Sequence, residues 1–236
     1  VKSHPKVPAR ILAGTPETVK VTNELGVLPI RNFSGERLEN SENLYANVFR
    51  EKLVVHDESC FSCPLPCGKT SIIRSGPYRG TQVQGPQYET IGLLGSNCGI
   101  TNIETVAMAN NLCNMGGMDT IESGNVIAFA MECYEKGFLT PADTGGIDLR
   151  FGNDSALIAS LEALINQTGF GLLLSGGAHG LAEKLDPETA KFAMISKGQG
   201  FASFEPRALV GMGLLYATSP VGANHSTGPT LSGEKA

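Results

Sequence analysis

Three cysteines within eight residues limit the folds open to this chain more than any other motif it carries. Cys60, Cys63 and Cys67 stand in the segment C-F-S-C-P-L-P-C-G, with the spacing C-x2-C-x3-C. Two prolines and a following glycine restrict the loop, so we expect the three thiolates to converge on a metal. Structural zinc usually takes a second pair of cysteine or histidine ligands, and none follows here. The spacing favours an iron–sulfur cluster with one distant fourth ligand. A zinc site or a reduced, unligated loop is the alternative.

The other three cysteines, Cys98, Cys113 and Cys133, lie in apolar surroundings. A free cysteine in such a setting usually acts as a small buried hydrophobic residue. Any of the three could supply the fourth ligand, but we interpret them as core residues. Three disulfides are not expected, because the chain is long and half of its cysteines crowd into one loop.

Composition excludes several classes of protein. Hydrophobic residues make up 41% of the 236 residues, enough for a real core, whereas charged residues make up only 17% and there are 29 glycines. Such a chain is suited to burial against partners or around a large ligand. The net charge of −5, without a basic block, gives no footprint for nucleic acid. Apolar runs are too short to span a membrane. The two ends are typical of a piece of a longer polypeptide.

The order of residue types predicts a mostly helical protein with long ordered loops. Prolines and glycines in residues 1–35 predict an irregular segment, and residues 36–53 form an amphipathic pattern that predicts a helix leading into the cysteine loop. Residues 68–99 are rich in glycine, proline and polar residues, which predicts a long functional loop. No strand-like alternation extends beyond a few residues.

Three longer helices and three shorter ones are predicted from capping residues and periodicity. Thr101 or Asn102 would cap a helix that ends at Gly116-Gly117, and Asp119 or Thr120 would cap a second one. The second helix covers residues 121–136, and a third follows Asn153 or Asp154 and ends at Gln167. Shorter helices are expected over residues 179–185, 187–194 and 207–217.

Several motifs in order along the chain resemble those of the tungsten-containing aldehyde ferredoxin oxidoreductases. The resemblance covers residues 14–230. Its elements are the cysteine segment, Gly85-Pro-Gln-Tyr-Glu-Thr90, Leu94-Gly-Ser-Asn-Cys-Gly-Ile100, Ala109-Asn-Asn-Leu-Cys-Asn-Met-Gly-Gly-Met-Asp-Thr120, Ile127-Ala-Phe-Ala-Met-Glu132, Pro206-Arg207, Tyr216-Ala-Thr-Ser219 and Gly222-Ala-Asn-His225.

The resemblance implies a domain organisation. Complete chains of the family are much longer, with a β-rich N-terminal domain followed by two largely helical domains. Residues 1–193 would be the helical second domain, carrying the cysteine loop and the first pterin motif, and residues 194–236 the truncated start of the third. The family's fourth cluster cysteine would lie beyond Ala236. We therefore expect the 236-residue chain alone to be inactive, its activity belonging to the parent polypeptide.

The first pterin motif of the family has the form Asp-x-x-Gly-Leu-Asp, and here it is Asn114-Met-Gly-Gly117-Met-Asp119. The resemblance assigns pterin binding to Asn114, Gly117 and Asp119. An asparagine offers one acceptor oxygen and two donors where a carboxylate would only accept, so the contact with the pterin amino group is weaker. A helix corner capped by Asp119 would explain the same residues without a ligand.

Two titratable residues match family positions beside the tungsten and its substrate. Glu89, in a loop-lined apolar pocket, would be the general base, and His225 would donate to the aldehyde oxygen. Without the resemblance, each would be interpreted as an ordinary surface residue. His4, His56 and His179 are interpreted as solvated. Gln84 and Gln87 replace acidic residues frequent in the family, which makes the pocket entrance less negative.

The function implied by the resemblance is oxidation of a small aldehyde to a carboxylic acid, with water as the oxygen source. The cofactors would be a tungsten or molybdenum bis-pterin centre, magnesium bridging the pterin phosphates, and a [4Fe–4S] cluster that passes electrons to ferredoxin. The setting would be cytoplasmic and anaerobic, and low charge content favours a homo-oligomer. The alternatives are an iron–sulfur electron-transfer or assembly subunit, and a reductase of activated aromatic acids from the same family.

Overall fold

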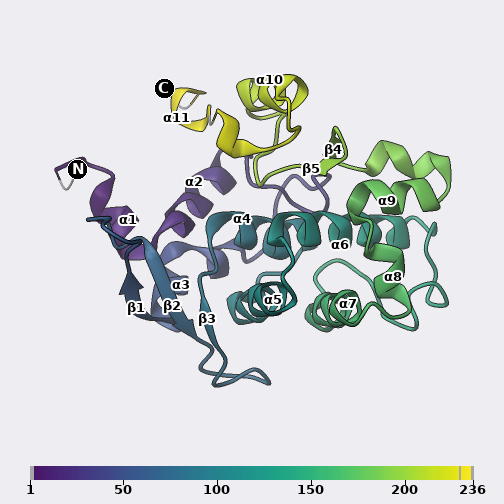
Figure 1. The fold of residues 1–236 in the computed structure, drawn as a ribbon, viewed down its shortest axis with the longest axis horizontal. Coiled ribbons are helices and arrows are strands. Elements are labelled where there is room, and N and C mark those ends of the chain that lie inside the picture. Colours follow the sequence, from purple (N-terminus) through teal and green to yellow (C-terminus); the bar gives the residue numbers. More distant parts are fainter. Residues whose placement is uncertain (1–2, 229, 235–236) are drawn as a thin grey trace.

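The structure, a computed structural model, describes residues 3–228 and 230–234 and confirms a mainly helical fold with a small sheet at one side (Figure 1). Helix α6 (Thr120–Glu135) lies at the centre of the molecule, with α5 (Ile103–Gly116) and α7 (Asp154–Asn166) on one side of it (Figure 1). The sheet lies beside α5, and the C-terminal helices lie over the opposite side of α6 (Figure 1). Among the described residues, no helix is long and apolar enough to cross a membrane.

The N-terminal segment is more regular than predicted. The irregular structure expected over residues 1–35 is wrong for residues 7–24, which are helical, and holds for residues 25–35. Pro8 and Pro16 occupy the first turns of helices, where a missing N–H breaks no hydrogen bond. The helix expected over residues 36–53 forms only in its second half, since Asn40 adopts a left-handed conformation with φ of 56°. The elements are α1 (Val7–Ala13), η1 (Thr15–Glu17), α2 (Thr18–Glu24), η2 (Ser41–Leu44) and α3 (Ala46–Lys52).

The cysteine loop connects two strands. The antiparallel sheet has the order β1-β2-β3, with β1 at Val54–Glu58, β2 at Gly68–Ile72 and β3 at Gln82–Gln84. The expected helix-to-loop junction at the cysteines is therefore wrong, because β1 intervenes. Strand β2 escaped prediction because its buried residues are Lys69, Thr70 and Ser71, which give no hydrophobic alternation.

The loop predicted for residues 68–99 is also wrong. After the two strands, the chain forms α4 (Tyr88–Thr90), the π-helix η3 (Ile91–Gly95) and η4 (Ser96–Cys98). Every residue of η3 is buried. Its glycines, which contributed to the loop prediction, allow this segment to pass through the core against α6.

The three longer helices confirm the capping analysis. They are α5 (Ile103–Gly116), α6 (Thr120–Glu135) and α7 (Asp154–Asn166), and the side chains of Asn102, Asp119 and Asn153 accept their first backbone N–H groups. Helix α6 is buried continuously from Ser123 to Cys133. A β-carbon on its Gly124 would lie only 2.6 Å from the carbonyl carbon of Leu93, so glycine allows α6 to touch the backbone of η3.

The remaining elements surround α6. They are α8 (Phe170–Leu174), α9 (Gly177–Lys184), η5 (Pro187–Phe192), β4 (Ile195–Ser196), β5 (Gln199–Gly200), α10 (Val210–Thr218), η6 (His225–Thr227) and α11 (Leu231–Glu234). The shorter helices predicted around 179–185 and 207–217 are confirmed with small shifts. The one predicted at 187–194 is a 3-10 helix, and α8 was not predicted. The Glu122 carboxylate joins α6 to α9 and β5 by accepting from the N–H groups of Ala178 at 2.7 Å and Gly200 at 2.9 Å.

Candidate active site

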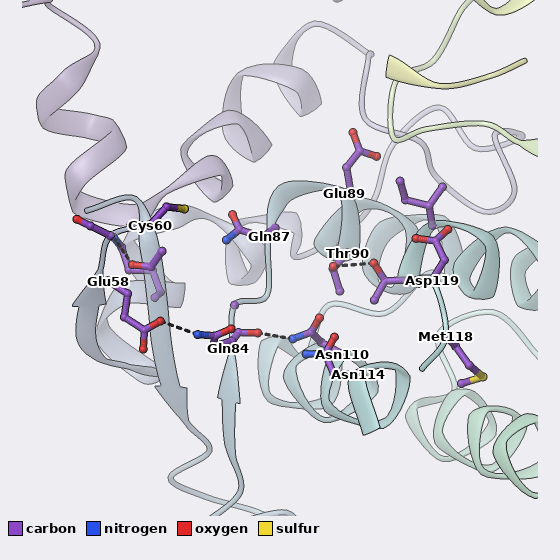
Figure 2. A pocket seen from close by; sticks show the side chains of 16 residues that line it. Glu58, Cys60, Gln84, Gln87, Glu89, Thr90, Asn110, Asn114, Met118 and Asp119 are labelled. Carbon is purple, nitrogen blue, oxygen red and sulfur yellow. Dashed lines mark hydrogen bonds between the residues drawn. The ribbon is translucent and has the colours of Figure 1, made fainter. Parts of the chain in front are cut away.

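A polar cavity of about 610 Å³ brings together motifs that are distant in the sequence. It lies between the cysteine loop, the sheet and the corner that joins α5 to α6 (Figure 2). Most of its lining residues carry an amide, hydroxyl or carboxylate group, and these donors and acceptors fit the edge of a pterin ring. The lining residues that matter below are Cys60, Lys69, Gln84, Glu89, Asn114 and Asp119.

The predicted pterin motif forms the corner between two helices. Gly117 ends α5 in the left-handed conformation, with φ of 63°, and the N–H of Met118 donates to Cys113 O at 2.8 Å. Asp119 caps α6 by accepting from Glu122 N at 2.8 Å through Oδ2. Asn114 and Asp119 line the cavity, whereas Gly117 shapes the turn. The cap and a ligand contact are compatible, because the cap uses only one carboxylate oxygen; pterin binding by these residues stays a prediction.

The cysteine loop presents its thiols at the surface. Cys60 and Cys63 are exposed, Cys67 is half-buried, and Cys60 borders the polar cavity. Three thiols on one short loop fit the donor chemistry of an iron–sulfur cluster. However, within the described ranges no group of three or more Cys, His, Asp or Glu side chains is arranged to hold a metal ion. The expected convergence of the three thiolates is therefore not seen.

A buried lysine that sequence reasoning missed supports the cysteine loop. Lys69 is 1% exposed, and its Nζ donates to Pro66 O at 2.8 Å and Gly68 O at 3.1 Å. The same ammonium lies 3.3 Å from Oδ1 of Asp57. Arg50 also pairs with Asp57, and its hydrogen bonds together with those of Lys69 lower the pKa of this carboxyl. In the sequence, only the position of Lys69 directly after Cys67-Gly68 indicates that this lysine supports the cysteine loop.

Hydrogen bonds connect the cysteine loop to α5 along one wall of the cavity. Gln84 Nε2 donates to Glu58 Oε2 at 2.7 Å, and Gln84 O accepts from Asn110 Nδ2 at 2.7 Å (Figure 2). Glu58 closely precedes Cys60, and Asn110 lies one turn before Asn114. The wall thereby fixes the distance between the cysteine loop and the predicted pterin motif.

The two predicted catalytic residues meet in the fold. His225 Nδ1 lies 3.5 Å from Glu89 Oε1, and the two side chains are 32% and 15% exposed. The other carboxylate oxygen, Glu89 Oε2, accepts from Ser203 N at 2.7 Å. Neither Glu89 Oε1 nor His225 Nδ1 makes a hydrogen bond with the described part of the chain, although both atoms are buried. Two facing, unsatisfied polar atoms are typical of a site that handles protons or a polar ligand.

Burial shifts the titration of both groups toward their neutral forms. It raises the pKa of Glu89 to about 7, with the Ser203 N–H partly offsetting this and the charge of Asp119 adding to it. Burial lowers the pKa of His225. A carboxylate with a pKa of about 7 is suited to accept a proton at neutral pH.

A second cavity, which we call the aromatic chamber, is lined by this pair and has a volume of about 380 Å³. Tyr88 and Phe204 form its apolar wall, with ring centroids 5.1 Å apart. Glu89 lines both the chamber and the polar cavity, as does Gln87. Glu89 therefore borders both cavities, whereas His225 borders only the aromatic chamber.

The structure confirms the other three cysteines as buried core residues and the other three histidines as solvated residues. Cys98, Cys113 and Cys133 are buried, and burial raises the pKa of each thiol, to about 11 for Cys113 and about 12 for Cys133. Such thiols stay protonated at neutral pH and are poor metal ligands. The other three histidines, His4, His56 and His179, are exposed.

Comparison with known proteins places these observations in a family. Residues 1–236 match the family model described as aldehyde ferredoxin oxidoreductase, domains 2 and 3. The chain is 34% identical over 215 residues to a tungsten-containing aldehyde ferredoxin oxidoreductase of Pyrococcus abyssi, covering 90% of this chain and 34% of that protein. It is 30% identical over 209 residues to the aliphatic sulfonate oxidoreductase, WOR-like subunit, of Pyrococcus furiosus. This match covers 86% of this chain and 33% of that protein.

A solved structure shares the fold. The BamBC active-site complex of benzoyl coenzyme A reductase, in complex with 1,5-dienoyl-CoA, superposes with a TM-score of 0.65 at 22% identity, covering 89% of this chain and 32% of that one. The chain thus spans about a third of the length of the proteins it matches. Through the match of its whole length to the family model, it belongs to the aldehyde ferredoxin oxidoreductase family.

Proposed function

We propose that the polypeptide containing this chain oxidises an aldehyde to the carboxylic acid, with the Glu89–His225 pair providing the acid–base chemistry. The observation that carries this proposal is the approach of Glu89 Oε1 to His225 Nδ1, at 3.5 Å, with Glu89 lining both cavities and His225 lining the aromatic chamber. The tungsten named in the relatives supports a tungsten centre in the polar cavity. Molybdenum would serve the same chemistry.

The reaction adds the oxygen of water to the aldehyde and releases two protons and two electrons. A bis-pterin tungsten centre supplies the two-electron redox chemistry when bound. Glu89 Oε1 accepts a proton from the water that becomes the new carboxyl oxygen, because its raised pKa keeps it a usable base near neutral pH. The His225 ring donates through its second nitrogen to the aldehyde oxygen and stabilises the charge that develops there.

Three of the residues proposed to hold the cofactors, Cys60, Asn114 and Asp119, line the polar cavity. At the corner that Gly117 shapes, Asp119 would accept hydrogen bonds from the pterin, Asn114 would accept and donate, and magnesium would bind with the pterin phosphates. Cys60, Cys63 and Cys67 would bind three irons of a [4Fe–4S] cluster, with the fourth ligand outside this chain. The exposure of Cys60 and Cys63 supports electron exit to ferredoxin at this surface.

The setting of the enzyme is part of the proposal. We infer a cytoplasmic, anaerobic protein in which residues 1–193 and 194–236 belong to successive domains, completed by the rest of the same polypeptide and assembled as a homo-oligomer. An electron-transfer subunit without catalysis would have no use for the Glu89–His225 pair. A reductase of activated aromatic acids would use the same cavities in the opposite chemical direction.

Aldehyde-dependent reduction of a low-potential viologen dye by the full-length polypeptide, purified without oxygen, tests the function. We expect turnover in the wild-type protein and a loss of about 10²–10⁴-fold in Glu89→Gln with metal content unchanged. Loss of tungsten in this variant would instead assign Glu89 a structural role. No oxidation of any aldehyde, together with reduction of benzoyl-CoA, would favour the reductase.

A further inference from the structure

The aromatic chamber combines apolar rings with titratable side chains. The Glu89–His225 pair lines it, together with the buried rings of Tyr88 and Phe204. The Phe204 ring also packs beside His225, with centroids 6.0 Å apart. A planar apolar group that enters the chamber would contact these rings and lie beside the side chains of Glu89 and His225.

The N-terminal segment closes the chamber with polar groups. Arg10 from α1 borders it, together with Thr15 and Thr18. Arg10 Nη2 lies 3.0 Å from Glu17 Oε1, and the arginine side chain is 31% exposed. A guanidinium has five N–H donors, so this ion pair leaves donors available to a second acceptor. Glu17 holds the guanidinium in place.

Hydrogen bonds connect the same N-terminal segment to Gln87 and Tyr88, which directly precede Glu89. Thr15 Oγ1 donates to Gln87 Oε1 at 2.5 Å and accepts from Tyr88 N at 2.9 Å. These bonds hold the N-terminal segment against the residues that precede Glu89. The chamber therefore combines a basic group, Arg10, with the Glu89–His225 pair in one lining.

We propose that the aromatic chamber binds an aromatic aldehyde that carries a carboxylate remote from its carbonyl group, and that Arg10 recognises this carboxylate. This inference rests on the proposed aldehyde oxidation and names its substrate class. The volume of about 380 Å³ lies at the small end of ligand pockets, which range over roughly 300–1,000 Å³, and suits a single aromatic ring. Arginine binds a carboxylate through paired, charge-assisted hydrogen bonds.

Substrate competition in the full-length enzyme tests the proposal. We expect kcat/KM to fall in the order 4-carboxybenzaldehyde, benzaldehyde, acetaldehyde. Arg10→Met should lower kcat/KM for 4-carboxybenzaldehyde about tenfold, the loss of one charge-assisted contact, and leave the ratio of benzaldehyde to acetaldehyde unchanged. Arg79→Met is the matched control, because Arg79 is exposed and lines neither cavity. Phe204→Leu should lower the preference for benzaldehyde over acetaldehyde several-fold.

Binding measurements separate this proposal from the catalytic one. Isothermal titration of the full-length protein should give a Kd for terephthalate about tenfold below that for benzoate, and Arg10→Met should remove the difference. The double variant Arg10→Met/Glu17→Gln should behave as Arg10→Met, which excludes an effect of the unpaired Glu17 carboxylate. Aldehyde oxidation without any dependence on Arg10 would overturn the chamber proposal alone. Arg10-dependent binding without oxidation of any aldehyde would overturn the proposed reaction instead.

Discussion

Replacing Glu89 with glutamine should stabilise the folded protein above neutral pH while it removes the proposed base. Burial raises the pKa of the Glu89 carboxyl from an ordinary 4.5 to about 7. Below pH 4.5 this group is mostly neutral in both the folded and the unfolded state, so its ionisation does not contribute to the free energy of unfolding. As the pH rises from 4.5 to 7, the unfolded chain loses its proton first, so the free energy of unfolding falls.

The magnitude follows from the size of the shift. A displacement from 4.5 to about 7 corresponds to about 3 kcal/mol, because each pKa unit is worth about 1.4 kcal/mol. Glutamine has nearly the same shape and keeps an oxygen that can accept from Ser203 N. Its amide can also donate to the unsatisfied Nδ1 of His225. We therefore expect Glu89→Gln to raise the free energy of unfolding by up to about 3 kcal/mol above pH 7 and to leave it unchanged near pH 4.

Urea unfolding of the cofactor-free full-length protein at several pH values, followed by circular dichroism, measures this difference. The exposed Glu162 provides a matched control, and Glu162→Gln should show no such pH dependence. In the loaded enzyme, kcat/KM should rise with pH through about 7 in the wild type, and this limb should disappear in Glu89→Gln. A stability difference that is equal at pH 4 and pH 8 would refute the burial argument.

Three further substitutions probe other parts of the account. Asn114→Asp should increase the pterin retained per chain after gel filtration, because a carboxylate only accepts hydrogen bonds; reduced retention would remove Asn114 from the site. Gly124→Ala should cost about 1–3 kcal/mol in urea unfolding, since its new β-carbon would meet the Leu93 backbone, whereas Gly180→Ala, in open space on α9, should cost nothing. Cys63→Ser should lower iron content and visible absorbance, and Cys133→Ser should not; equal iron in both would exclude Cys63 as a ligand.

The helical part of the fold was predictable because its signals are local. Asn102, Asp119 and Asn153 cap their helices through side-chain hydrogen bonds that depend only on nearby residues. The sheet and the N-terminal helices depend on tertiary context. Strand β2 buries Lys69, whose charge is satisfied by Asp57 and by loop carbonyl groups. These partners lie outside the strand, so the residue pattern of the strand does not predict the burial.

The candidate site was predictable only in part. Periodicity and spacing identified the cysteine loop and the helix corner, but Glu89 and His225 became candidates through family resemblance alone. Their approach at 3.5 Å depends on the path of the chain around α6, which local patterns do not encode. The aromatic chamber was missed for the same reason, because Arg10, Phe204 and His225 come from three separate segments.

Metal analysis with a visible spectrum, on the full-length polypeptide purified without oxygen, tests the central claim most directly. The account predicts tungsten or molybdenum together with about four irons per chain and the broad visible absorption of an iron–sulfur cluster. Iron without tungsten or molybdenum would contradict it and leave an electron carrier, in which Glu89 and His225 have no catalytic role. One zinc per chain without visible absorption would contradict both the cluster and the proposed oxidation.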